Sequence, residues 1–175
     1  RALSINNKAL GPRHLGTVRS LIGLAQLQHK QGKYLQAERL LQGALQFLER
    51  GSGIPYAVAL SNLAMGYMAQ NRHAQAEPLL RQALKIAETT LGSTHRIVAK
   101  LLNNLGLNYK SLARYSEAEP LLQRAISTYQ ATLGLKHPDS WAPINNLALV
   151  YVAQERFLEA VGRFQQAIDI AENHH

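Results

Sequence analysis

The sequence predicts an all-helical fold in which antiparallel helix pairs stack on one another. Three observations support this prediction. The chain aligns with itself at steps of 42 residues, each step holds two amphipathic stretches, and only a short polar turn separates the two. A fixed period of this length is typical of repeat architectures, in which each unit buries its apolar face by stacking on its neighbours.

The first helix of each repeat carries an apolar stripe. Leu60, Leu63, Ala64 and Tyr67 follow the i, i+3, i+4, i+7 spacing of one helix face. Stretches matching residues 60–67 lie at 21–28, 102–109 and 144–151. The later copies follow at 42-residue steps, and the weaker first copy precedes residue 60 by 39. We therefore expect four first helices.

The second helix of each repeat has a stripe of its own, formed in one copy by Ala76, Leu79, Leu80 and Ala83. Its copies lie at 37–44, 76–83, 118–125 and 160–167. Short turns precede these stretches at Gly32-Lys33, Asn71-Arg72, Ala113-Arg114 and Glu155-Arg156, so each pair should be antiparallel. Pro78 and Pro120 fall in or just after the first turn of a helix, where proline is tolerated best.

The connector between repeats also recurs. A Leu-Gly pair precedes His14, His95 and His137, and glycine at residues 92 and 134 suits the left-handed end of a helix. The three histidines share one position of the repeat, so they should be a repeated structural feature rather than a cluster. Residues 50–55 replace this connector between the first two repeats and account for the missing three residues.

The order and spacing of Leu60, Leu63, Ala64 and Tyr67, followed by the 76–83 stripe, resemble the tetratricopeptide repeat. The 42-residue period and the stretches LNNL and AEPLL resemble the kinesin light chains and their bacterial relatives. The usual first-position Trp is absent, and Gln28 replaces the usual Tyr in the first repeat. The resemblance implies a right-handed α-solenoid without catalytic activity. It further implies that the first helices line a concave groove for short cargo peptides, often acidic and built around Trp.

The resemblance covers the whole chain as one array. We expect the end of a preceding second helix at 1–11 and repeats at 14–50, 54–91, 95–133 and 137–173. The first residues look like the middle of a helix and the final His pair like a tag remnant, so we expect an excised fragment. Trp141 should begin the first helix of the fourth repeat, as a packing or capping residue.

A helical wheel with about 100° per residue places one set of side chains away from the hairpin core. These are the residues that we expect to bind a peptide in the concave groove. They are Arg19, Gln26, Lys30, Ser61, Asn62, Met65, Lys100, Asn103, Asn104, Leu107, Ser111, Asn145, Asn146 and Leu149.

Five asparagines in this set are the most informative feature, because asparagine is a poor helix former. Amides that both donate and accept hydrogen bonds could grip a peptide backbone. The alternative is a ladder between helices, in which each amide bonds to its neighbour in the next repeat. The residues leave both interpretations open.

The net charge of +8 favours an acidic partner. Residues 1–50 carry eight Lys and Arg against Glu38 and Glu49, so the charge is concentrated there. One alternative function is self-assembly through the ends of the array. A weaker one is non-specific nucleic-acid binding, which is disfavoured because no aromatic residues interleave with the basic ones.

Enzymatic chemistry has no support in the sequence. There is no cysteine, no H-E-x-x-H motif, no phosphate loop and no nucleophile elbow. We therefore expect no enzyme, no cofactor and no metal site. The absence of cysteine fits a reducing compartment, so we expect a cytoplasmic protein, and no apolar run approaches the roughly 20 residues of a membrane span.

Overall fold

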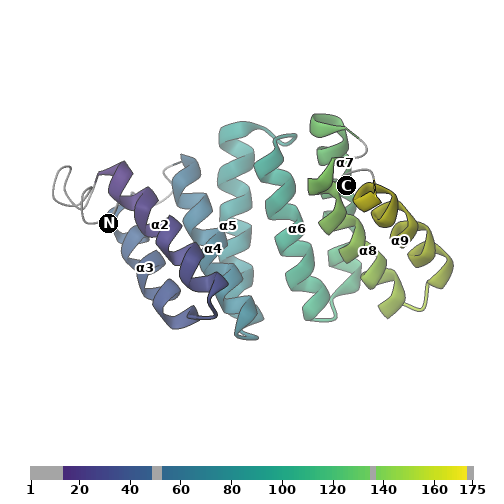
Figure 1. The fold of residues 1–175 in the computed structure, drawn as a ribbon, viewed down its shortest axis with the longest axis horizontal. Coiled ribbons are helices and arrows are strands. Elements are labelled where there is room, and N and C mark those ends of the chain that lie inside the picture. Colours follow the sequence, from purple (N-terminus) through teal and green to yellow (C-terminus); the bar gives the residue numbers. More distant parts are fainter. Residues whose placement is uncertain (1–13, 49–52, 135–136, 173–175) are drawn as a thin grey trace. The chain divides into compact units, whose positions relative to one another are not determined.

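The computed structural model describes residues 14–48, 53–134 and 137–172, and these residues form helices with no strand. The helices are α2 (Leu15–Lys30), α3 (Tyr34–Phe47), α4 (Gly53–Ala69), α5 (His73–Leu91), α6 (Arg96–Ser111), α7 (Tyr115–Leu133), the short 3₁₀ helix η1 (Pro138–Ser140), α8 (Trp141–Ala153) and α9 (Phe157–Glu172). Figure 1 follows them from α2 in purple to α9 in yellow. The all-helical prediction is confirmed. The helix end expected at 1–11 lies outside the described residues.

The helices group into two compact units, Arg1–Ile86 and Ala87–His175, whose boundary falls within α5. In unit 1, α2 packs on α3, and both pack on α4. In unit 2, α6 packs on α7, α8 packs on α9, and α8 also contacts α6 and α7. Each first helix therefore contacts helices other than its own hairpin partner.

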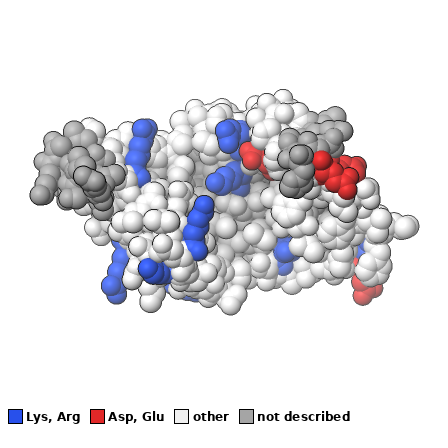
Figure 2. Space-filling model, viewed as in Figure 1, with Lys and Arg blue, Asp and Glu red and all other residues white. Residues whose placement is uncertain are grey.

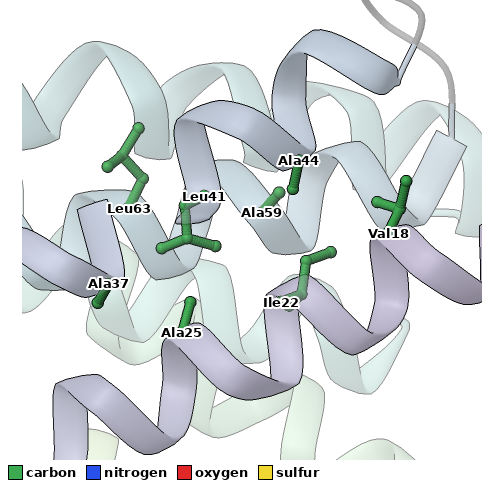
Figure 3. Close-up of a cluster of buried hydrophobic side chains, with 8 residues drawn as sticks. All are labelled: Val18, Ile22, Ala25, Ala37, Leu41, Ala44, Ala59 and Leu63. Atoms are coloured by element: carbon green, nitrogen blue, oxygen red, sulfur yellow. The ribbon is translucent and has the colours of Figure 1, made fainter. Parts of the chain in front are cut away.

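Small residues let these helices approach one another. In unit 1, Val18, Ile22 and Ala25 of α2 meet Ala37, Leu41 and Ala44 of α3, with Ala59 and Leu63 of α4 completing the cluster (Figure 3). In unit 2, a Cβ atom on Gly106 of α6 would lie 2.7 Å from Cγ of Leu122 on α7. Only glycine fits there without displacing Leu122.

The short turns share one backbone conformation. Gly32, Asn71, Ala113 and Glu155 all have positive φ, between 56° and 74°. The amide that follows each of these residues bonds back to the last turn of the helix, as in the bond from Arg156 N to the Tyr151 carbonyl at 2.9 Å. This left-handed helix ending reverses the chain within a few residues.

The three connector histidines are helix N-caps. Nδ1 accepts a hydrogen bond from the amide two residues later, from Gly16 to His14, from Ile97 to His95 and from Asp139 to His137, each at 3.1 Å. A side-chain acceptor at this position satisfies one of the free amides at a helix start. The prediction of a repeated structural feature is confirmed.

Candidate protein-binding face

The predicted binding residues occupy equivalent positions on the first helices, but their exposure differs. On the first helices of unit 1, Arg19, Gln26 and Lys30 are exposed and Asn62 and Met65 are half-buried. On those of unit 2, Lys100, Ser111 and Leu149 are exposed, whereas the half-buried ones are Asn103, Leu107, Asn145 and Asn146. We call these twelve residues the first-helix faces of the two units.

Two of the predicted residues are buried instead. Ser61 is 7% exposed and Asn104 is 6% exposed, so the exposure expected from the helical wheel is wrong for both. The wheel counted only the stripe that faces the hairpin partner. A first helix within a stack is covered on its flanks as well, because each repeat packs against its neighbours.

One asparagine pair forms the inter-helix bond that was the alternative to ligand binding. Asn146 Nδ2 of α8 donates to Asn103 Oδ1 of α6 at 2.9 Å. In unit 1 the equivalent pair is Asn62 of α4 and Ile22 of α2. Ile22 has no hydrogen-bonding side chain, so the same bond cannot form there. Asn62 Nδ2, equivalent to Asn146 Nδ2, is buried without a hydrogen-bond partner. The ladder interpretation therefore holds for Asn103 and Asn146.

The first helices carry basic residues and no carboxylate. Within α2, α4, α6 and α8 there is no Asp or Glu, whereas five Lys and Arg occur there: Arg19, Lys30, Arg96, Lys100 and Lys110. Arg96 lies 3.6 Å from Asp139, which follows the connector. Partial burial lowers the pKa of Lys110 below its usual value. The exposed cations of the first-helix faces are Arg19 and Lys30 in unit 1 and Lys100 in unit 2.

Successive repeats are joined by a set of contacts that the sequence pattern did not predict. In unit 1, Arg72 Nη1 lies 2.9 Å from Glu38 Oε2, and its guanidinium stacks 4.1 Å from the Tyr67 ring centroid. The Tyr67 hydroxyl also donates to Glu38, at 3.2 Å. Burial and the nearby Glu38 carboxylate raise the pKa of Tyr67. We call Glu38, Tyr67 and Arg72 a junction triad.

A second junction triad in unit 2 consists of Glu119, Tyr151 and Arg156. Arg156 Nη1 lies 2.6 Å from Glu119 Oε2, its guanidinium lies 4.1 Å from the Tyr151 ring centroid, and the Tyr151 hydroxyl donates to Glu119 at 3.2 Å. The recurring Tyr-x4-Arg spacing at 67–72, 109–114 and 151–156 was the available signal. The first repeat has Gln28 and Lys33 at these positions.

Known structures resemble this fold. The crystal structure of BtubC (BKLC) from P. vanneervenii matches 100% of this chain and 71% of its own length, with a TM-score of 0.86 and 25% identity. A putative kinesin light chain from Podosopora anserina with nearly identical TPR-like repeats matches 99% of this chain and 83% of its own, with a TM-score of 0.73 and 25% identity. PilF of Pseudomonas aeruginosa matches 89% and 62%, with a TM-score of 0.71 and 25% identity.

The family comparison agrees with the repeat pattern. No curated protein matches the chain in sequence. In the described parts of the chain, every helix is too short or too polar to span a membrane. The tetratricopeptide repeat model matches residues 1–50, 55–131 and 113–173. Members of this family generally mediate protein–protein interactions. The chain belongs to the tetratricopeptide repeat family, and its structural neighbours include kinesin-light-chain-like members.

Proposed function

We propose that the chain binds an acidic polypeptide segment on its first-helix faces, without catalysing a reaction. The observation that carries this proposal is the absence of any carboxylate from α2, α4, α6 and α8, beside the exposed Arg19, Lys30 and Lys100. A surface with one sign of charge attracts ligands of the opposite sign and repels those of the same sign.

The neutral residues of each unit's first-helix face suit a polypeptide rather than a bare anion. Leu149 is 36% exposed, and Met65 and Leu107 are half-buried at the equivalent position of the repeat. Asn145 adds an amide that can donate and accept. Apolar contacts beside charged ones would give the ligand affinity that pure charge attraction does not.

A peptide array followed by a binding titration tests this proposal. On the peptide array, the spots that bind the protein should be those whose peptides are rich in Asp and Glu. In the titration, Arg19→Glu with Lys30→Glu, both on α2 of unit 1, should weaken the best peptide by about a hundredfold, because attraction becomes repulsion at two positions. The matched control is Lys33→Glu with Arg39→Glu, which changes net charge equally at exposed residues outside the first helices.

The two variants separate a local effect from a global one. Equal weakening by both would assign binding to net charge and overturn the first-helix location. If the protein instead bound spots with basic or neutral peptides, the prediction of an acidic ligand would be wrong.

A further inference from the structure

Helix α2 of unit 1 presents one line of exposed residues along its length. Arg19, Gly23, Gln26 and Lys30 are all exposed. Successive steps of four, three and four residues keep them within about 60° of one another around the helix axis. The helix runs without a break from Leu15 to Lys30, so the line covers three full turns. We call these four residues the α2 line.

The exposure of the two cations belongs to their position in the repeat. In unit 2, Lys100 and Ser111 of α6 occupy the positions of Arg19 and Lys30. Both are exposed, although α7 and α8 pack on α6. A first helix therefore presents these two positions to solvent even where other helices cover its remaining sides.

Gly23 lies in the middle of the α2 line without a packing reason for its small size. Glycine within a helix is destabilising relative to alanine. A Cβ atom on Gly23 would meet nothing within 4 Å, so no neighbouring group requires glycine there. The other three repeats have asparagine at this position, namely Asn62, Asn104 and Asn146. The missing side chain leaves room for the backbone of a ligand to approach α2 closely.

The polar side chains of the α2 line are available to a ligand. Within residues 14–48, 53–134 and 137–172, the side chains of Arg19, Gln26 and Lys30 form no hydrogen bond or ion pair. Helix α2 has no carboxylate, and Figure 2 shows basic and no acidic atoms over it. The Gln26 amide can both donate and accept. It suits an extended backbone, whose N–H and C=O groups are not paired with one another as they are in a helix.

The distance between the two cations sets the spacing of charges in the ligand. Arg19 and Lys30 are separated by a rise of about 16 Å along the helix axis, at about 1.5 Å per residue. An extended chain advances about 3.1–3.4 Å per residue, so about five residues cover the same distance. The flexible Arg and Lys side chains absorb small mismatches. Two carboxylates much closer together or much further apart would not reach both cations at once.

We propose that unit 1 binds an extended segment of a partner protein lengthwise along the α2 line. Two carboxylates of the segment, about five residues apart, pair with Arg19 and Lys30, and its backbone lies against Gly23 and Gln26. This inference rests on the proposed function of binding an acidic polypeptide. It adds the conformation of the ligand, the spacing of its charges and the helix along which it lies.

Three synthetic peptides of equal charge test the spacing. Each has about 14 residues on a Pro/Thr background, which keeps the chain extended, with acetylated and amidated ends that carry no charge. Each carries two Glu residues, separated by two, five or ten positions. Binding is measured by NMR titration of the isotope-labelled protein. The five-position peptide should bind about tenfold more tightly than the other two and shift the backbone signals of α2, because it alone engages both cations together.

Variants of the protein locate the site without depending on net charge. Gly23→Leu should weaken the five-position peptide by about tenfold, because the new side chain occupies the space of the ligand backbone. Gly43→Leu on α3 is the matched control, since a Cβ there also meets nothing within 4 Å, and should leave binding unchanged. Arg19→Gln should remove the preference for the five-position peptide, because one cation remains and either Glu can pair with it.

Two results would overturn the α2 line as the binding site and leave the acidic ligand class intact. The first is equal affinity for the three spacings. The second is binding to Gly23→Leu as tight as to the wild type. If the protein bound none of the three peptides and no acidic peptide on the peptide array, the proposed function would fail as well.

Discussion

Arg72 and Glu38 are 34 residues apart in the sequence, yet Nη1 of the arginine lies 2.9 Å from Oε2 of the glutamate. The pair joins the turn of one repeat to the second helix of the repeat before it. Arg156 and Glu119 repeat the arrangement in unit 2 at 2.6 Å. In both cases the arginine also stacks on the tyrosine five residues before it. Successive hairpins are thus held by a polar contact in addition to apolar packing.

Removal of one junction carboxylate should destabilise the array. We expect Glu119→Ala to lower the free energy of unfolding by about 1–2 kcal/mol, because it removes charge-assisted bonds at partly buried side chains. Urea unfolding monitored by circular dichroism measures this change. Glu172→Ala is the matched control, since Glu172 is exposed on α9, and should change stability by less than about 0.5 kcal/mol. Equal effects would show that the triad contributes nothing specific.

The two related asparagines should respond differently to the same substitution. Asn146→Ala should cost about 1 kcal/mol, because it removes the bond to Asn103 and leaves that amide oxygen unpaired. Asn62→Ala should be neutral or stabilising by up to about 1 kcal/mol, because its buried Nδ2 has no partner and alanine is the better helix former. Thermal unfolding of the two variants compares them directly. A larger loss for Asn62→Ala would contradict the assignment of the ladder.

Two buried glycines offer a test of helix packing. Gly106→Ala should destabilise the protein by about 1–3 kcal/mol, because the new methyl group would overlap Leu122. Gly66→Ala is the control, since a Cβ there meets nothing closer than His29 Cδ2 at 3.9 Å. It should stabilise by about 0.5–1 kcal/mol through helix propensity. Denaturant midpoints that move in the same direction would argue against the close approach of α6 and α7.

Alkaline pH should weaken the fold through Tyr129. Burial, with the nearby Asp139 carboxylate adding to it, raises the pKa of Tyr129 from 10.0 to about 12. Between these values the unfolded chain releases the proton while the folded chain keeps it, so stability falls as pH rises from 10 to 12 and is intact below 10. Melting temperatures of the wild type and of Tyr129→Phe across this range isolate the contribution. The variant should show the shallower decline, and identical slopes would contradict the shift.

The repeat, the two helices of each unit and the turns between them could all be predicted from the amino-acid sequence. These features depend on local periodicity and turn chemistry, so Leu60, Leu63 and Ala64 predict a helix without knowledge of its neighbours. The recurring histidines were also recognisable as structural, although their role as N-caps required the geometry of Nδ1 and the amide two residues later.

The division of the polar residues into those that face solvent and those that join repeats could not be predicted, because it depends on how the hairpins pack in three dimensions. The helical wheel treated Asn104 as open, but a stacked helix is covered on more than one side, so the residue is 6% exposed. The partnership of Arg72 with Glu38 likewise depends on how one hairpin lies on the next. Helical periodicity reports contacts within a hairpin, whereas contacts between hairpins depend on three-dimensional packing, and for this reason the candidate binding surface was less predictable than the fold.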